Sequence, residues 1–220
     1  MRATRVLRRL LAMSPSRRRQ WLTLKRDRFI TAVFHARRLR RLGQATIVQN
    51  PLFWTPEFVE LGNRVLIWPG CRIEGVSQFA NRFYLPAITI GDNVNIQQGC
   101  HITFAGELVI GSDSAILAGA LITDIDHSYH AIDINLNDQP IVVQTTRIGR
   151  FCVVGAGARI LAGTVMGDNC VIGANSVVRG KFPDRCVIAG APARIIRRFD
   201  PEAAEWRKTD AKGKFLDGNK

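Results

Sequence analysis

A six-residue period runs through residues 148–183 and constrains the fold more than any other feature of the chain. An aliphatic side chain stands at every sixth position, a glycine follows it in four of the six units, and a small side chain comes four positions after it in five. Such a period is typical of a parallel β-helix, in which each unit is one short strand plus a turn and three units close a triangular coil. The aliphatic side chains then fill the interior, and the coils stack about 4.8 Å apart. The aliphatic positions are Ile148, Val154, Ile160, Met166, Ile172 and Val178.

The same period continues upstream of residue 148, but two insertions interrupt it. They contain 11 residues (79–89) and 20 residues (128–147). Insertions of this kind leave a β-helix as loops, so we expect the chemistry of the protein to lie in or beside them. Residues 44–60 are expected to be irregular or strand-like, and the sequence leaves the period after Pro183. Five coils are predicted, at residues 61–78, 90–107, 110–127, 148–165 and 166–183.

The chain is predicted to form three parts. Residues 1–43 form a basic amphipathic helical segment, and residues 44–190 form the β-helix domain with its two loops. Residues 191–220 form a C-terminal segment, in which PEAAEWRK (201–208) is expected to be a short helix.

The positive charge of the protein is confined to its N-terminal segment. Residues 1–42 hold 14 lysines and arginines and one acid, whereas the rest of the chain holds 17 basic and 17 acidic residues. Apolar residues have helical spacing at 1–13 and at 17–42, and the second helix is expected to end at Gly43. A basic helix that carries Trp and Phe suits an anionic membrane surface, and the alternative is a helix that packs on the β-helix. Nucleic acid is not an expected partner, because no nucleic-acid-binding motif accompanies the charge.

The sequence predicts a cytoplasmic protein with reduced cysteines. No apolar run approaches the roughly 18 residues of a transmembrane helix, and no signal-peptide core follows the basic N-terminus. The chain has five cysteines, an odd number, and four of them occupy the small position of the repeat, where buried free thiols are expected. Cys152 and Cys170 are 18 residues apart and should stack on adjacent coils.

The end of the third predicted coil departs from the repeat in a way that is typical of a functional site. Asp126 replaces the small residue, His127 follows it, and the 20-residue insertion begins directly afterwards. A neutral imidazole can remove the proton of an attacking hydroxyl group. Asp124 or Asp126 could fix its tautomer, as the acid does in hydrolase triads. A turn in which an aspartate caps backbone amides is the alternative interpretation.

The hexapeptide pattern, the DIDH unit (124–127) and the ending IGANSVVRG and AGAPARIIRR resemble the left-handed β-helix acyltransferases. The resemblance covers roughly residues 44–206 and is closest to the O-acetyltransferases of lipopolysaccharide O-antigen and capsule biosynthesis, with similarity to galactoside and maltose acetyltransferases. It implies a homotrimer that transfers an acetyl group from acetyl-CoA to a hydroxyl of a sugar or lipid-linked saccharide, without a metal. The basic N-terminus would then hold the enzyme at the inner face of the bacterial inner membrane.

The resemblance also implies the site residues. Asp124 matches the acid and His127 the second histidine of an Asp-His-Asn-His-like stretch, in which Ile125 replaces the first histidine; His130 is the alternative base. Many relatives have lysine where Gly180 stands and tryptophan where Val153 stands. The implied coenzyme A contacts are Ala156, Ala174, Arg179, Gly180, Arg194 and Arg197.

Three other functions remain open at this stage. The first is N-acetylation of a nucleotide-linked amino sugar, which would use the same base and cofactor groove. The second is a γ-type zinc carbonic anhydrase, which needs three converging histidines, and the third is a non-catalytic trimeric scaffold. Residues that recognise the acceptor are expected in the loops 79–89 and 128–147.

Overall fold

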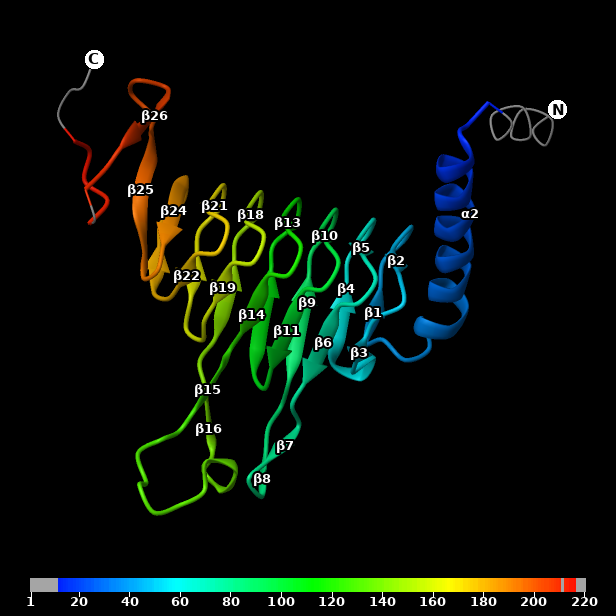
Figure 1. The fold of residues 1–220 in the computed structure, drawn as a ribbon, viewed down its shortest axis with the longest axis horizontal. Helices are drawn as coiled ribbons and strands as arrows, with labels where there is room; N and C mark the ends of the chain where they lie inside the picture. The colour runs from blue at the N-terminus through cyan, green and yellow to red at the C-terminus, as the bar shows by residue number, and fades with distance from the viewer. Residues whose placement is uncertain (1–11, 211, 217–220) are drawn as a thin grey trace.

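The computed structural model describes residues 12–210 and 212–216. They form a left-handed parallel β-helix, whose coils follow one another along the long axis of the molecule from helix α2 to strand β25 (Figure 1). In each coil the chain passes through three walls, each of which is a parallel sheet. Six complete coils and two strands of a seventh occur in this part of the chain, and the predicted fold class is confirmed.

The walls are ladders of short strands that occupy equivalent positions in successive coils. The first wall contains β1 (Arg41–Leu42), β4 (Val59–Leu61), β9 (Ala87–Ile90), β12 (Glu107–Ile110), β17 (Thr146–Ile148), β20 (Val165–Met166) and β23 (Lys181–Phe182). The second contains β2 (Ile47–Val48), β5 (Leu66–Ile67), β10 (Asn95–Ile96), β13 (Ala115–Ile116), β18 (Val153–Val154), β21 (Val171–Ile172) and β24 (Cys186–Gly190). The third contains β3 (Phe53–Trp54), β6 (Arg72–Gly75), β11 (His101–Phe104), β14 (Leu121–Thr123), β19 (Arg159–Ile160) and β22 (Val177–Val178).

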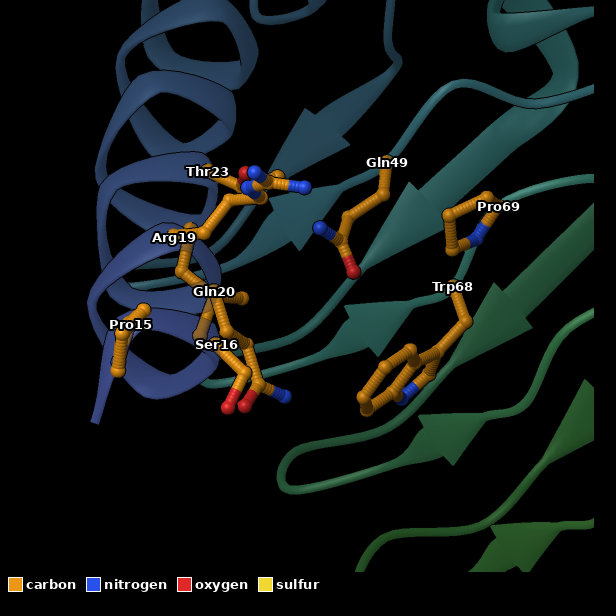
Figure 2. Close-up of a pocket in the computed structure, with 9 residues that line it drawn as sticks. Pro15, Ser16, Arg19, Gln20, Thr23, Gln49, Trp68 and Pro69 are labelled. Carbon is orange, nitrogen blue, oxygen red and sulfur yellow. The ribbon is translucent and has the colours of Figure 1, made fainter.

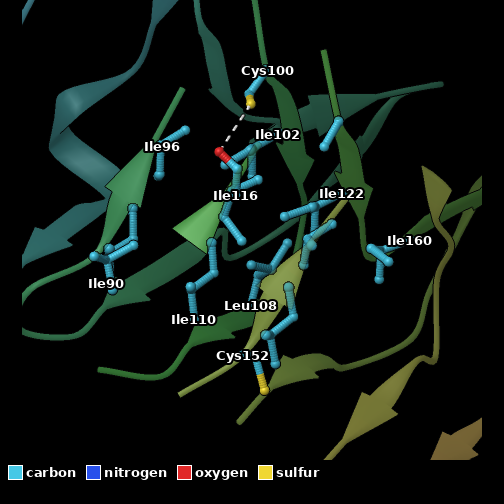
Figure 3. Packing of buried hydrophobic residues seen from close by; sticks show 14 of the residues in the cluster. Ile90, Ile96, Cys100, Ile102, Leu108, Ile110, Ile116, Ile122, Cys152 and Ile160 are labelled. Atoms are coloured by element: carbon cyan, nitrogen blue, oxygen red, sulfur yellow. Dashed lines mark hydrogen bonds between the residues drawn. The ribbon is translucent and has the colours of Figure 1, made fainter. Parts of the chain in front are cut away.

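Aliphatic side chains fill the interior of the β-helix, as the period predicts. All 15 in-phase positions of the five predicted coils have at most 1% of their surface exposed. The strand register places them directly above one another: Ile96 is paired with Ile67 in one neighbouring coil and with Ile116 in the other. Figure 3 shows part of this column. Burial of each such side chain contributes roughly 1.5–3 kcal/mol, so the column is a large source of stability.

The small side chains of the repeat are buried beside this column. All five cysteines are buried free thiols, which confirms the expectation for the thiols. The Sγ atom of Cys100 donates a hydrogen bond to the carbonyl oxygen of Leu117 at 3.2 Å. Cys152 and Cys170 precede the paired residues Val153 and Val171, so they do stack on adjacent coils.

The glycine of the repeat is required because successive coils approach closely at that position. A Cβ atom on Gly149 would lie 2.3 Å from the carbonyl oxygen of Gly167, and one on Gly155 would lie 2.6 Å from the backbone nitrogen of Ala174. Non-bonded atoms do not approach each other this closely, so a side chain at either position would force the coils apart.

Strands of the β-helix continue beyond the five predicted coils at both ends. For residues 44–60 the strand-like alternative holds, because β2 and β3 complete with β1 a coil that pairs with β4, β5 and β6. Leu42, Val48 and Trp54 give this coil its own six-residue spacing. At the other end β24 continues the second wall beyond Pro183 and buries Ile188 completely.

The predicted C-terminal helix at 201–208 is wrong. This stretch forms a turn and β26 (Glu205–Lys208), which pairs antiparallel with β25 (Ala193–Asp200), itself antiparallel to β24. The Asp200 carboxylate accepts hydrogen bonds from the backbone N–H groups of Glu202 and Ala203 and so closes the turn. Phe199 and Trp206 then pack edge to face, with ring centroids 5.7 Å apart, which favours the hairpin over a helix.

Helix α2 (Pro15–Ile30) and a π-helical turn (Thr31–His35) precede the first coil. Ser14 caps the helix, and its hydroxyl accepts a hydrogen bond from the backbone N–H of Arg17. The helix ends before Ala36 and does not reach Gly43, because Arg41 and Leu42 pair with the first wall. The helix predicted at residues 1–13 lies almost wholly outside the described residues.

Two buried polar groups attach α2 to the first coil. The Asp27 carboxylate accepts a hydrogen bond from the Nε2 atom of Gln49 at 2.7 Å. The Thr31 hydroxyl accepts one from the backbone N–H of Val48 at 2.9 Å. One face of the helix therefore packs on the β-helix, and the opposite face carries Leu22 and Phe29 into solvent. No helix in the described ranges is long and apolar enough to cross a membrane.

Both insertions follow strands of the third wall and extend from the β-helix on the same side (Figure 1). The first contains a hairpin of β7 (Gln78–Phe79) and β8 (Arg82–Phe83). The second begins beside β15 (Ile125–His127), which pairs with β16 (Ile141–Val143), and contains a 3-10 turn (Leu136–Asp138) at its tip. The Tyr84 hydroxyl accepts a hydrogen bond from the backbone N–H of Ile141 at 3.3 Å and joins the two loops. Another 3-10 turn (Pro56–Phe58) precedes β4.

Candidate active site

His127 lies where the chain leaves the fourth of the six coils, which is the third predicted one. It is the last residue of β15 and is paired with Ile141 of β16. Its imidazole contacts the ring of Phe79 edge to face, with centroids 5.5 Å apart. The side chain is exposed, and no described residue hydrogen-bonds to its ring nitrogens. Packing therefore positions the imidazole, and both nitrogens are free to meet a substrate.

A pocket of about 390 Å³ adjoins His127. Its floor is the outer face of the third wall at β6, β11 and β14, and the two loops form its sides. Neutral hydroxyl groups, one ion pair and an aromatic ring all face the same space, as is usual for ligand sites. The lining residues are Arg72, Glu74, Val76, Gln78, Phe79, Thr103, Leu121, Thr123, Ile125, His127 and Ile141.

Asp124 is completely buried and holds the backbone of the preceding coil. Its Oδ1 atom accepts a hydrogen bond from the N–H of Ala105 at 2.9 Å, and its Oδ2 atom accepts one from the N–H of Gly106 at 2.8 Å. Burial raises the pKa of this carboxyl group, and the two backbone N–H groups oppose the rise. The structure therefore favours the capping interpretation for Asp124.

Asp126 is half-buried and points to a different partner. Its Oδ1 atom forms an ion pair with the Nη2 atom of Arg179 at 2.8 Å. Neither Asp124 nor Asp126 hydrogen-bonds to His127 within the described chain. The arrangement in which a carboxylate orients the histidine is thus not formed, although all three residues lie within four positions of one another.

The other histidines are dispersed. His130 is exposed and stacks on Tyr129, with ring centroids 4.8 Å apart. His101 lies on β11, where burial and the neighbouring charge of Arg72 lower the pKa of its imidazole. His35 packs on Trp54 near α2. No group of three or more metal-binding side chains occurs at 12–210 or 212–216.

Two of the predicted cofactor residues lie on one line along the β-helix. Ala156 and Ala174 are exposed in equivalent turns between the second and third walls. The backbone N–H of Asn175 donates a hydrogen bond to the carbonyl oxygen of Ala156 at 2.9 Å, so the two turns are stacked. A small side chain at each position leaves the backbone of both turns accessible.

The remaining predicted cofactor residues lie nearer the C-terminal end. Arg179 and Gly180 follow β22, and Gly180 has a φ angle of 120°, a conformation that favours glycine. Arg194 and Arg197 are exposed on β25, opposite Ala189 and Val187 of β24. The structure thus distributes these residues over successive coils and does not gather them in one pocket of the single chain.

Sequence reasoning missed Arg72, Glu74 and Thr103 as site residues. The first two flank the inward-facing Ile73 and so share the outer face of β6. A charged residue on each side of an interior position, in the strand that precedes an insertion, is a signal that could have identified them.

A second pocket of about 520 Å³ lies between α2 and the turns of the first two coils (Figure 2). The side chains of Gln49 and Trp68 face the helix across it. It contains none of the predicted site residues, so it is separate from the candidate active site.

Comparison with known proteins identifies the family. The model of the bacterial transferase hexapeptide repeat matches residues 145–180. The putative lipopolysaccharide biosynthesis O-acetyl transferase WbbJ of Escherichia coli is 34% identical in an alignment of 141 residues that covers 61% of this chain and 72% of that protein. The chain belongs to the hexapeptide-repeat acyltransferases. The putative colanic acid biosynthesis acetyltransferase WcaF of Escherichia coli is 28% identical over 63% of this chain and 68% of that one.

Solved structures of hexapeptide acyltransferases share the fold. AntD, an N-acyltransferase from Bacillus cereus in complex with dTDP and coenzyme A, gives a TM-score of 0.61 at 16% identity over 80% of this chain and 90% of that chain. Galactoside acetyltransferase in complex with coenzyme A gives a TM-score of 0.51 at 19% identity over 89% of this chain and 90% of that chain. These likenesses show the fold, whereas the acyltransferase class follows from the relatives named above.

The two aspartates of the DIDH unit are expected to differ sharply in their effect on stability. Asp124→Ala leaves the buried N–H of Ala105 and the partly buried N–H of Gly106 without an acceptor, and a buried group that loses its partner costs roughly 1–3 kcal/mol. Asp126→Ala removes an exposed ion pair, which costs about 0–1 kcal/mol. Urea unfolding followed by circular dichroism measures both losses. Equal losses in the two variants would show that Asp124 is not a structural anchor.

Proposed function

We propose that this enzyme transfers the acetyl group of acetyl-CoA to a hydroxyl group of a cell-envelope saccharide, with His127 as the general base. The observation that carries the proposal is an exposed imidazole beside a pocket that two loops enclose. The names of WbbJ and WcaF, an O-acetyl transferase of lipopolysaccharide biosynthesis and an acetyltransferase of colanic acid biosynthesis, support the acceptor class.

One histidine is sufficient for this reaction. The acceptor oxygen attacks the thioester carbonyl while the imidazole of His127 takes its proton. The new C–O bond forms, the C–S bond breaks, and the imidazolium returns the proton to the departing thiolate of coenzyme A. No acyl-enzyme intermediate is required, and backbone N–H groups can stabilise the oxyanion. The edge-to-face contact with Phe79 keeps the ring in place through these steps.

Acetyl-CoA is proposed to lie along the turns that contain Ala156 and Ala174. Their exposed positions on successive coils suit an elongated ligand that follows the axis of the β-helix. Arg179, Arg194 and Arg197 are exposed further along, and arginine binds phosphate groups through paired hydrogen bonds. Gly180 lies beside Arg179, and its backbone is accessible because it lacks a side chain. The ion pair between Arg179 and Asp126 connects this region with the strand that carries His127.

The active unit is proposed to be a homotrimer with its sites between chains. The two insertions support this assembly, because they expose large apolar side chains that a second copy could cover. Leu85 is 90% exposed and Ile132 is 95% exposed.

N-acylation is the second candidate reaction. The fold likeness to AntD, whose structure contains dTDP and coenzyme A, favours it. The base and the cofactor groove would be the same, and only the acceptor would differ. Parallel assays with hydroxyl and amino sugars separate the two reactions.

Helix α2 is proposed to hold the enzyme at the anionic cytoplasmic face of the inner membrane. Leu22 and Phe29 on α2 are exposed at the i, i+7 spacing of one helical face, and Val33 in the following π-helical turn is exposed as well. Lys25 and Arg26 are exposed beside them. The apolar face is short, so attraction between the basic residues and anionic lipid should supply much of the binding.

His127→Ala is expected to lower the turnover number for acetyl transfer by about 10²–10⁴-fold, since a general base contributes that much. His130→Ala should stay close to wild type, because its ring stacks on Tyr129 outside the pocket. Transfer of radiolabelled acetyl groups to saccharides measures the rate, and thermal unfolding checks that both variants are folded. Normal turnover in His127→Ala would refute the assignment of the base.

Arg179→Ala is expected to raise the KM for acetyl-CoA about tenfold or more, because a hydrogen bond to a charged group contributes roughly 1.5–3 kcal/mol. Asp126→Ala is the matched control, since it breaks the same ion pair but leaves the arginine. Initial rates at varied acetyl-CoA give both constants. If Asp126→Ala raises the KM by the same factor, the ion pair and not a phosphate contact explains the effect.

Leu22→Glu with Phe29→Glu is expected to abolish binding to vesicles of phosphatidylglycerol and phosphatidylcholine. Acidic side chains on this face oppose both the apolar contact and the attraction to anionic lipid. Ile196→Glu, on the exposed face of β25, is the control and should bind like wild type. Vesicle flotation measures binding. Equal flotation of wild type with anionic vesicles and with phosphatidylcholine alone would contradict the proposal.

A further inference from the structure

An ion pair forms part of the floor of the His127 pocket. Arg72 and Glu74 lie two residues apart on β6, so both side chains stand on its outer face, and both line the pocket. Side-chain exposure is 42% for the arginine and 20% for the glutamate. The pair therefore faces the same enclosed space as the proposed base, across β11 and β14.

The ion pair uses only part of its hydrogen-bonding capacity. Two nitrogens of Arg72, Nε at 2.7 Å and Nη2, donate to the same oxygen of Glu74, Oε2. Among the described residues nothing bonds to the other oxygen, Oε1, or to the third nitrogen, Nη1. One acceptor and one donor of the pair are thus available, and each belongs to a charged group, which strengthens its hydrogen bonds.

The guanidinium group is held in place before any ligand binds. It lies over the ring of Phe53, which is paired with Arg72 in the third wall, at 5.2 Å from the ring centroid. Contacts on one side with a carboxylate and on the other with an aromatic face restrict its rotamers. A fixed donor and acceptor reduce the ordering cost of binding, which favours recognition of one ligand geometry.

We propose that Arg72 and Glu74 bind two neighbouring hydroxyl groups of the acceptor sugar, an assignment that rests on the proposed function. One hydroxyl donates to Oε1 of Glu74, and its neighbour accepts from Nη1 of Arg72. The pair has no net charge, so it selects a neutral diol over a phosphate or an ammonium group, each of which suits only one partner. A third hydroxyl of the bound saccharide is then presented to His127.

Thr103 and Thr123 extend this polar floor toward the base. They are paired with each other in the third wall, and Thr103 is also paired with Glu74. Two strand spacings, about 10 Å in all, separate Glu74 from Thr123. A floor of this length accommodates more than one pyranose ring. The diol on the ion pair can therefore belong to a different sugar residue from the one that is acetylated.

The test combines variants with deoxygenated acceptors. Acetyl transfer is measured with octyl glycosides of galactose, glucose, mannose and rhamnose and of a disaccharide of each, and then with monodeoxy analogues of the best acceptor. Glu74→Gln and Arg72→Gln remove one charge each. Glu107→Gln and Arg147→Gln are matched controls on the outer face of the first wall, away from the pocket.

Both pocket variants are expected to raise the KM for the saccharide about tenfold or more, because the site loses a charged hydrogen-bonding partner. The Kd for acetyl-CoA from calorimetry should not change. One deoxy analogue should have a higher KM than its parent saccharide with wild type, but the same KM as its parent with Glu74→Gln. The missing hydroxyl and the missing charge remove the same contact, so the two losses do not add. The two controls should match wild type.

The assignment of Arg72 and Glu74 would be overturned if the effect of every deoxy analogue on the KM simply added to the effect of the Glu74→Gln substitution. It would also be overturned if the saccharide KM were unchanged in both pocket variants. Either result leaves the proposed function intact. If wild type acetylates none of the saccharides, the proposed function fails, and the diol site fails with it.

Discussion

The structure depends on one repeated contact, the stacking of an aliphatic side chain on its equivalent in the next coil. Ile67, Ile96 and Ile116 illustrate it, since each is paired with the next and all are completely buried. Because each inner coil buries its interior against two neighbouring coils, strands of only two residues are enough to build the walls. The side chains on the outer faces and in the insertions do not contribute to this core, so they are available for binding and catalysis.

The sequence predicts the β-helix well because its period is dictated by this contact. The first coil escapes prediction because one of its three interior positions is the aromatic Trp54 and because it begins inside the basic segment. The C-terminal hairpin escapes because PEAAEWRK has good helix formers. Its conformation is decided by the Asp200 turn and by the pairing of β26 with β25, which is itself paired with β24. These tertiary contacts override the local helix propensity.

The candidate site is predictable in part for a similar reason. His127 marks the broken repeat, and the pocket forms where both insertions leave the β-helix. The partners of Asp124 could not be read from the sequence, because they are backbone N–H groups at Ala105 and Gly106. These residues form the turn between β11 and β12, and only the stacked structure places them under the carboxylate. The Arg72–Glu74 pair depends likewise on which face of β6 lies outward.

The strand that carries His127 is secured from three directions. Asp124 bonds to the preceding coil, Asp126 bonds to Arg179 in a later one, and the strand itself pairs with β16. None of these attachments involves residues 128–140, which form the tip of the second insertion. The tip can therefore change in length and composition without displacing the imidazole. With His127 as the proposed base, exchange of the loop tip on this framework would change the acceptor and leave the position of the base unaltered.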